Sequence, residues 1–376
     1  MRMLIGAVAH NSMSSKESEM KMGKKKLTCI DFFCGCGGLS KGFEQAGYSV
    51  LAGIDFEQSA LNTFELNHNG AKGLRLDLFK QDEAFAKIDE CIKGKKIDVI
   101  IGGPPCQGFS LTGPRNFNDK RNQLYLSVIE AVKRYSPRAF MIENVPGMAT
   151  LYNGAVKDEI LRRFSEIGYD VSCQILCAAD YGVPQIRKRL FFVGIRDADR
   201  KFEFPRPMLD PSHYITCREA ISDLPSLEYD LGGEELAYEN EPSTDFQKAM
   251  RGDCSVLHNH TAVAHKDFVK KVIALVPDGG NYKDLPPGVG DSRRFNMAWT
   301  RYASDKPSRT IDTGHRNNFH YKWNRCPTVR ESARLQSFPD DFVFTGTKTQ
   351  QNRQVGNAVP VLLAQAVANA IKASLK

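Results

Sequence analysis

The sequence predicts an α/β protein with a doubly wound, Rossmann-like domain and a second, smaller and irregular domain. Between residues 27 and 195, short apolar segments alternate with amphipathic ones, a pattern typical of a largely parallel sheet with helices on both faces. After residue 195, prolines interrupt every periodic run through a long region. A chain of 376 residues can bury a separate core in each of two domains.

The expected elements follow these periodicities in chain order. We expect strands over the apolar runs at residues 27–33, 49–54, 97–101, 138–142 and 190–195. We expect helices over the amphipathic runs at residues 39–46, 57–67, 122–135 and 156–167, and again at 328–337 and 358–373. The predicted boundaries are a disordered tail at 1–26, a first domain at 27–195 plus 346–376, and a second domain at 196–345.

Composition narrows the class of protein. The net charge of +7 and the pI near 8.8 favour a polyanionic partner. The ten cysteines form no C-x-x-C pair and no small-scaffold disulfide framework, which is consistent with a reducing cytoplasm. Cys254 with His258, His260 and His265 matches no zinc spacing, so we expect polar loop residues there and no metal. No apolar run approaches the length of a membrane span, so we expect no membrane partner.

A glycine-rich loop is expected where the first strand ends and the first helix begins. Gly35, Gly37 and Gly38 follow Phe33 and would let a ligand approach the backbone at the amino end of the helix. The dinucleotide fingerprint needs a further glycine where this chain has Ser40. The loop therefore predicts a nucleotide-type cofactor and disfavours a nicotinamide dinucleotide.

The ends of two further apolar segments carry residues suited to a nucleoside. Asp55 ends the second strand and could accept hydrogen bonds from ribose hydroxyls, and Phe56 beside it could stack on adenine. Asp77 ends the next short apolar run and could receive the adenine amino group. As single residues, all three would more often be strand-end caps and packing groups, but together with the glycine loop they favour cofactor contacts.

Cys106 lies between a diproline and a glycine, directly after the strand expected at 97–101. Pro104 and Pro105 hold the chain extended and place the thiol at the carboxyl end of a strand, where open α/β sheets bind ligands. The pattern is typical of a reactive nucleophile. The alternative is a small buried apolar residue, the commoner fate of a cytosolic cysteine.

Charged groups emerge near the same sheet edge. Glu143 and Asn144 follow the strand at 138–142, and a glutamate there could exchange a proton with a bound heterocycle if burial raises its pKa. Arg187 and Arg189 alternate along an extended segment and so share one face, where one could hold a substrate oxygen and the other a carboxylate or phosphate. A solvated basic strand is the alternative for this pair.

Basic and aromatic residues alternate between residues 291 and 325, and both tryptophans, Trp299 and Trp323, lie there. Such a surface suits phosphate contact and the reading of base edges, whereas the alternative is a small basic core with aromatic packing. The arginines that we expect to contact nucleic acid are Arg294, Arg301, Arg309 and Arg316.

Six ordered motifs resemble those of the cytosine-5 DNA methyltransferases, over residues 27–195 and 328–373. They are F-x-G-x-G-G at 33–38, P-C-Q at 105–107, E-N-V at 143–145, Q-x-R-x-R at 185–189, R-E-S-A-R-L-Q-S-F-P at 330–339 and Q-V-G-N-A-V-P at 354–360. The resemblance implies methyl transfer from S-adenosyl-L-methionine to C5 of a cytosine flipped out of double-stranded DNA. It also implies that residues 196–345 form the target-recognition domain.

The resemblance assigns roles residue by residue. Cys106 would attack C6 of the base, Glu143 would act at N3, and Arg189 would bind O2 and orient the acid. Asn144 would hold the local backbone, Arg187 would belong to the same catalytic group, and Pro105 would lie at the exocyclic amino edge. Gln107 and Ser110 would contact DNA, within or beside a mobile lid at 108–122. The implied cofactor pocket consists of Phe33, Gly35, Gly37, Gly38, Asp55, Phe56, Asp77, Leu78, Pro105, Leu124, Asn357 and Ala358.

Other functions remain as alternatives. A tRNA cytosine-5 methyltransferase of the same family would typically carry a Cys-Phe-Thr tripeptide, which this chain lacks. A catalytically idle DNA-binding module is disfavoured because Cys106, Glu143 and Arg189 are all present. We expect a monomer in the bacterial cytoplasm, associated with the nucleoid when bound to DNA, with a separate restriction endonuclease as a candidate partner.

Overall fold

The structure is a computed structural model that describes residues 26–105, 124–197, 201–291, 298–314 and 318–375. The expected tail lies outside these residues except for its last position, Lys26. The expected lid lies outside them as well.

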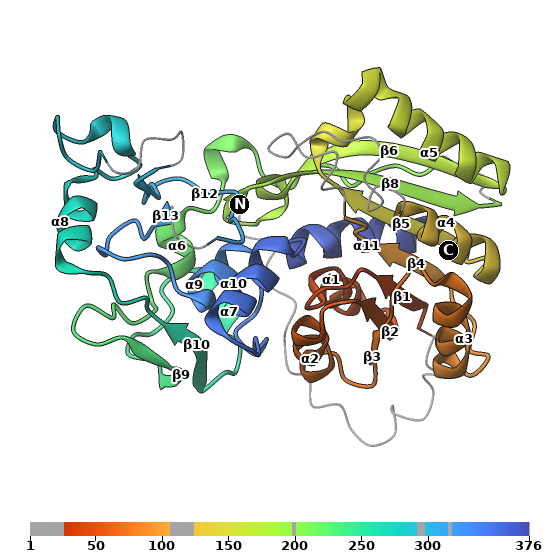
Figure 1. Cartoon of the computed structure of the whole chain (residues 1–376), viewed down its shortest axis with the longest axis horizontal. Helices are drawn as coiled ribbons and strands as arrows, with labels where there is room; N and C mark the ends of the chain where they lie inside the picture. The colour runs from red at the N-terminus through yellow and green to blue at the C-terminus, as the bar shows by residue number, and fades with distance from the viewer. Residues whose placement is uncertain (1–25, 106–123, 198–200, 292–297, 315–317, 376) are drawn as a thin grey trace, which may run out of the picture.

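A seven-stranded sheet in the order β3-β2-β1-β4-β5-β8-β6 forms the centre of the first domain (Figure 1). Its strands are β1 (Thr28–Phe32), β2 (Ser49–Asp55), β3 (Lys72–Arg75), β4 (Val99–Gly102), β5 (Ala139–Asn144), β6 (Tyr169–Cys177) and β8 (Lys188–Arg196). Strands β3 to β5 in this order run parallel, whereas β8 is antiparallel to both β5 and β6. The α/β class is confirmed, and the sheet is mixed rather than purely parallel.

The two strands that the sequence pattern missed, β3 and β6, are the two edges of the sheet. Along β3 no residue is fully buried, and along β6 buried positions alternate irregularly with exposed ones. An edge strand buries fewer side chains than a central one, so it needs no continuous apolar run.

Helices cover both faces of the sheet, as expected. One hydrophobic cluster joins the sheet to α1 (Gly38–Gln45), α2 (Gln58–Asn67) and α11 (Val361–Ser374). A second cluster joins it to α3 (Gln81–Ile92), α4 (Leu124–Tyr135) and α5 (Ala155–Glu166). Of these helices only α3 has no counterpart among the predicted elements.

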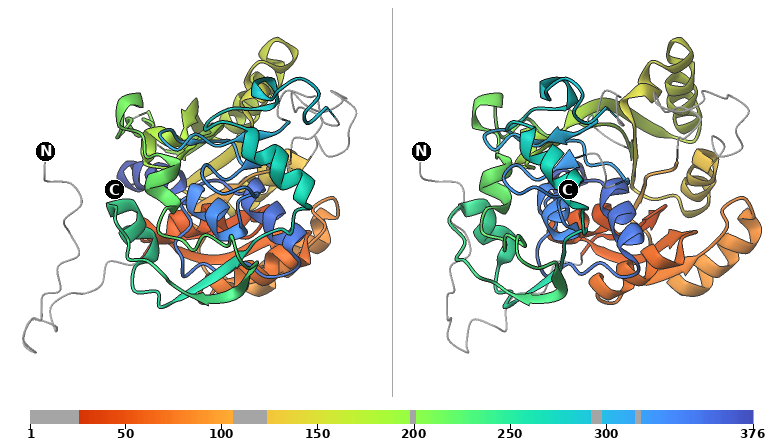
Figure 2. Two further views of the ribbon diagram at one scale, coloured as in Figure 1. Left: turned by 90° about the vertical axis from the view of Figure 1, so that its left-hand side faces the viewer. Right: turned by 60° about the vertical axis from the view of Figure 1, so that its left-hand side comes forward.

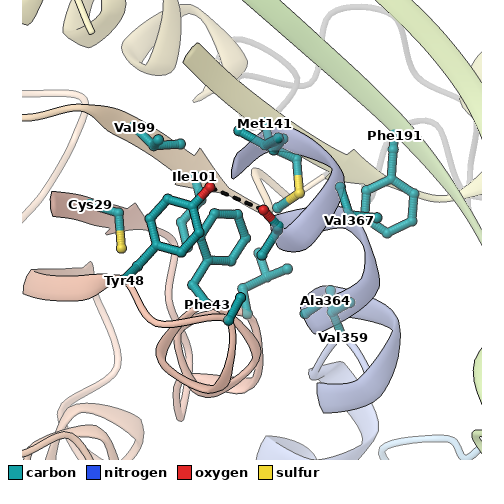
Figure 3. Packing of buried hydrophobic residues seen from close by; sticks show 14 of the residues in the cluster. Cys29, Phe43, Tyr48, Val99, Ile101, Met141, Phe191, Val359, Ala364 and Val367 are labelled. Carbon is teal, nitrogen blue, oxygen red and sulfur yellow. Dashed lines mark hydrogen bonds between the residues drawn. The ribbon is translucent and has the colours of Figure 1, made fainter. Parts of the chain in front are cut away.

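The last helix returns to the first domain and packs against α1 (Figure 3). A Cβ atom on Gly42 would lie 2.5 Å from the Cβ of Ala364, so the missing side chain allows the two helices to approach closely. The Tyr48 hydroxyl donates a hydrogen bond of 3.0 Å to the Ala368 carbonyl. The helical stretch Lys348–Ser374 is long and apolar enough to meet a length and composition criterion for a membrane span, but 61% of that window is buried inside the protein. Packing in the core explains its apolar character.

The described residues between 201 and 345 gather at the end of the molecule opposite to α3 and α5 (Figures 1 and 2). They contain α6 (Cys217–Ile221), α7 (Asp245–Arg251), α8 (Asp267–Leu275), α9 (Val329–Leu335) and the antiparallel strands β9 (Gly232–Ala237) and β10 (Val256–Thr261). The remaining strands there, β11 (Thr300–Arg301), β12 (Ser308–Arg309) and β13 (Asn318–Phe319), have two residues each. The region has more regular structure than we expected, in short pieces.

Buried ion pairs hold these short pieces together. Arg334 is fully buried and donates to Asp340 at 2.7 Å and to Asp223 at 3.1 Å. Arg325 binds both carboxylate oxygens of Glu331, at 2.7 and 2.8 Å. Because buried charges are tolerated only when they are paired and hydrogen-bonded, these contacts fix how the segments meet.

Candidate active site

A pocket of about 800 Å³ lies where strands of the parallel part of the sheet end. Strand ends contribute Phe33, Asp55, Asp77 and Glu143, and the helix α10 (Lys348–Asn357) contributes a further wall. Of the twelve predicted cofactor residues, eleven line this pocket: Phe33, Gly35, Gly38, Asp55, Phe56, Asp77, Leu78, Pro105, Leu124, Asn357 and Ala358. The structure therefore brings together residues that are more than 300 positions apart in the chain.

The glycine loop has the tight conformation that its sequence suggests. Gly37 is the remaining predicted cofactor residue and does not line the pocket. Its φ of 96° is left-handed, and a Cβ atom there would lie 2.1 Å from Nε2 of His68. Gly38 packs so tightly that a Cβ atom would lie 2.6 Å from the Val359 carbonyl oxygen. Gly37 provides the left-handed conformation of the turn, and Gly38 allows the turn to pack closely against the carboxyl-terminal segment.

Asp55 braces the loop while it lines the pocket. Its carboxylate accepts hydrogen bonds from the backbone N–H groups of Gly35 at 2.8 Å and Glu57 at 2.9 Å. Burial raises the pKa of Asp55, and the backbone hydrogen bonds oppose this shift. The strand-end capping that we considered as an alternative is thus present, in a residue that also faces the pocket. Asp77 likewise accepts a bond of 3.0 Å from the Phe79 N–H.

Glu143 and Arg189 form an ion pair on the pocket wall. Nε of Arg189 lies 2.8 Å from Oε1 of Glu143, and their side chains are only 15% and 12% exposed. Burial raises the pKa of Glu143, whereas the charges of Arg189 and Arg187 act in the opposite direction. The backbone of Gly103 lies close to the Glu143 carboxylate, and a Cβ atom on Gly103 would lie only 3.3 Å from Oε2 of Glu143. The pair can present a carboxyl group that has a raised pKa and is held in one orientation.

Asn144 holds the diproline segment against β5. Its side-chain N–H donates to the Pro104 carbonyl at 3.1 Å, and its side-chain oxygen accepts from the Val145 N–H at 2.8 Å. This contact anchors the backbone directly before Cys106. Cys106, Gln107 and Ser110 themselves lie outside the described residues.

Arg187 differs from the expected arrangement. Its guanidinium is buried and donates to the carbonyls of Ile311 at 3.3 Å and Gly356 at 2.9 Å. The preceding strand β7 (Gln185–Ile186) pairs with β12, which draws residues 308–311 against this segment. Both arginines line the pocket, but Arg189 meets the carboxylate while Arg187 joins three parts of the chain. The alternative of a solvated basic strand is therefore wrong for this pair, whereas Arg189 pairs with a carboxylate as expected.

The arginines predicted to contact DNA separate into different environments. Arg301 is 6% exposed and donates to the carbonyls of Ile273 and Val276 at 2.6 and 2.9 Å, among others. This guanidinium is a core group, so the prediction of DNA contact is wrong for Arg301. Arg309 is exposed, and Arg294 and Arg316 lie outside the described residues.

Trp299 is also a core group. It is 3% exposed and donates to the Gly290 carbonyl at 3.0 Å. For Arg301 and Trp299 the alternative of a small basic core with aromatic packing is the one the structure supports. His260 in the histidine cluster is buried too, with ring nitrogens 2.9 Å from the Thr328 hydroxyl and the Pro225 carbonyl.

The sequence reasoning missed part of the pocket. The helix α10 supplies Gln350, Arg353 and Gln354, and the capping box at Thr347 and Gln350 was a detectable signal for its start. Gln354 donates to the Ser59 carbonyl at 3.1 Å, yet its Oε1 is buried with no partner among the described residues. Nε of Arg187 is likewise buried with no hydrogen-bond partner among the described residues. A polar ligand in the pocket could satisfy such groups.

The chain is similar to proteins of a known family. Residues 27–373 match the model of the family described as C-5 cytosine-specific DNA methylase. The chain is 40% identical over 354 residues to the Type II methyltransferase M1.HphI of Haemophilus parahaemolyticus, covering 92% of this chain and 86% of the relative. It is 38% identical over 370 residues to the Type II methyltransferase M.DdeI of Desulfomicrobium norvegicum, covering 92% and 88%.

Solved structures agree as well. A prophage-encoded protein of E. coli, assigned as a DNA modification methyltransferase, has a TM-score of 0.76 at 28% identity, covering 93% of this chain and 99% of that one. The Dnmt2 methyltransferase of S. pombe has a TM-score of 0.57 at 16% identity, covering 93% and 98%, and shares the fold. The chain therefore belongs to the family of C-5 cytosine-specific DNA methylases and is a DNA cytosine-5 methyltransferase.

Proposed function

We propose that this enzyme is a Type II, sequence-specific methyltransferase that modifies C5 of a cytosine flipped out of double-stranded DNA through a covalent adduct with Cys106. The observation that carries the proposal is the Glu143–Arg189 pair, which lies on the wall of the same pocket as the glycine loop. The curated relatives named above are Type II methyltransferases, and this supports the same class here.

S-adenosyl-L-methionine fits the chemistry of the pocket. Asp55 and Asp77 offer carboxylates for ribose hydroxyls and an exocyclic amine, and Phe56 offers an aromatic face for adenine. The unpartnered Oε1 of Gln354 offers an acceptor and Nε of Arg187 a donor. When bound, the sulfonium cofactor supplies the electrophilic methyl group.

The protein's part in the chemistry is to make C5 nucleophilic. A cytosine ring is a poor electrophile, so addition of the Cys106 thiolate at C6 requires relief of the charge that enters the ring. The raised pKa of Glu143 favours a carboxyl proton that can be shared with N3, and Arg189 can bind O2 while it orients the acid. The new S–C6 bond leaves an electron pair at C5, which would form the bond to the methyl group while the methyl–sulfonium bond breaks and the demethylated thioether leaves. Loss of the C5 proton to a base and cleavage of the S–C6 bond then restore the aromatic ring and the thiolate.

Residues 196–345 would select the DNA sequence. Of the four arginines predicted to contact DNA, Arg309 is described by the structure and exposed, so it is the first candidate. We further propose a monomer that works in the bacterial cytoplasm, with a cognate restriction endonuclease acting separately. The boundaries 27–195 plus 346–376 for the catalytic part and 196–345 for target recognition remain part of this proposal.

The test combines trapping and sequencing. Wild-type enzyme should form a denaturation-resistant complex with a duplex that carries 5-fluorocytosine at the target, whereas Cys106→Ala should not, although it should still bind DNA and cofactor. Conversion sequencing of DNA from expressing cells should reveal one methylated motif. Full methyl transfer by the Cys106→Ala variant would exclude the adduct. Methylation of tRNA in preference to DNA would instead support an RNA methyltransferase.

A further inference from the structure

Phe56 is an exposed aromatic residue at the mouth of the pocket. Its side chain is 65% exposed, although it lines the pocket directly after the end of β2. A solvent-exposed ring on a single bond samples several rotamers, and a ring that must stack on a ligand loses that freedom on binding. A neighbouring group that restricts the Phe56 side chain to one rotamer before the ligand binds would therefore strengthen binding.

Arg75 contacts Phe56 at two points. The guanidinium carbon lies 5.6 Å from the centroid of the Phe56 ring, and Nε donates a hydrogen bond of 3.2 Å to the Phe56 carbonyl. The register of the sheet places Arg75 opposite Asp55, the residue before Phe56. One contact fixes the backbone at the strand end, and the other acts on the ring through a cation–π interaction.

We infer that Arg75 is a positioning residue for cofactor binding, which holds the Phe56 ring in place to stack on the adenine of S-adenosyl-L-methionine. The inference rests on the proposed function, because it assumes an adenine ligand. An aromatic ring has two faces, so a guanidinium on one face leaves the other for a base. Arg75 itself does not line the pocket, which distinguishes its role from that of a direct ligand contact.

The test measures binding and not activity alone. Calorimetry with S-adenosyl-L-methionine and with its demethylated product should show about 2- to 5-fold weaker binding for Arg75→Gln, the range for an exposed cation–π contact. Arg75→Lys keeps a cation near the ring and should recover part of the loss. In steady-state assays KM for the cofactor should rise, while kcat at saturation and KM for DNA should stay unchanged.

A matched control separates positioning from general stability. The guanidinium of Arg134 also lies 5.6 Å from a phenylalanine ring, that of Phe85, but it belongs to α4 and does not line the pocket. Arg134→Gln should leave cofactor affinity unchanged, and thermal melting of both variants will report the loss of stability.

A double-mutant cycle then identifies the partner of Arg75. In a Phe56→Leu background, Arg75→Gln should cause no further loss of affinity, because the ring it holds is absent. Unchanged affinity in the single Arg75→Gln variant, or fully additive losses in the double variant, overturns the inference while the proposed function stands. Failure of the wild-type enzyme to bind the sulfonium cofactor at all would overturn both.

Discussion

Replacing Glu143 with glutamine tests the catalytic site most directly, because the substitution keeps the shape of the side chain and removes its titration. The amide oxygen can still accept the hydrogen bond that Arg189 Nε makes at 2.8 Å. The guanidinium keeps its charge while its acceptor becomes neutral, so we expect a stability loss of about 1 kcal/mol. Loss of general acid–base assistance should lower the rate of methyl transfer by about 10²-fold or more. That factor corresponds to about 2.7 kcal/mol of transition-state stabilisation, which the stability loss does not explain.

The raised pKa of Glu143 predicts how the rate of methyl transfer changes with pH. Burial raises the pKa of Glu143, so the carboxyl group stays protonated to a higher pH than an exposed glutamate. The single-turnover rate of the wild-type enzyme should therefore decrease as the pH rises through this raised pKa, and Glu143→Gln should lack that decrease. The free energy of unfolding should depend on pH with the same sign. The contribution of the protonated Glu143 to stability is present at low pH and is lost as the pH rises through the folded-state pKa.

The assay is rapid-quench methyl transfer over a pH series, with calorimetry to show that cofactor affinity is retained. Glu159→Gln is the matched control, because Glu159 also accepts from arginines but lies on α5 outside the pocket. The control should leave the rate and its pH profile unchanged. Single-turnover rates for Glu143→Gln equal to those of wild type at every pH would refute the assigned role.

Three further predictions follow from described contacts. Gly42→Ala should destabilise the protein by about 1–3 kcal/mol in denaturant unfolding, because the new methyl group meets Ala364 at 2.5 Å; an unchanged unfolding midpoint would contradict the close packing of α1 and α11. Asp55→Ala should weaken calorimetric binding of both cofactor and product, since it removes a pocket carboxylate and leaves two backbone N–H groups without their acceptor; equal affinities would argue against a cofactor role. Arg301→Gln should lower the melting temperature markedly, because it leaves several buried carbonyls unpaired. Arg309→Gln should leave stability unchanged and weaken DNA binding. It should also reduce by about one the slope of the logarithm of the DNA-binding constant against the logarithm of the salt concentration. The reverse pattern would show that we have assigned these two arginines wrongly.

Local sequence was sufficient for the central strands and for the glycine loop, Asp55, Phe56 and Asp77 of the pocket, whereas Leu124, Asn357 and Ala358 were expected only from the family resemblance. β1, β2, β4 and β5 are buried on both faces, so each requires an apolar run that is visible in the chain. Residues at the carboxyl ends of parallel strands meet at one sheet edge by geometry, which is why the strand order alone predicts Glu143 at the edge that also carries the Pro104–Pro105 segment. The edge strands β3 and β6 escaped prediction because one side of each has no partner strand to impose such a pattern.

The sequence by itself determined the α/β class, the order of the motifs and the kind of chemistry that the site can perform, since these depend on periodicity and on residue types at short spacing. Only the tertiary structure decided which arginine does what. Arg301 and Arg309 are alike in the sequence, yet one is enclosed by carbonyls of residues 19 or more positions away and the other is exposed. Arg187 and Arg189 also differ in their partners, because the carbonyls of Ile311 and Gly356 bind one while Glu143 binds the other. The desolvation of a long charged side chain depends on distant segments that supply its hydrogen bonds, and no local pattern encodes which segments those are.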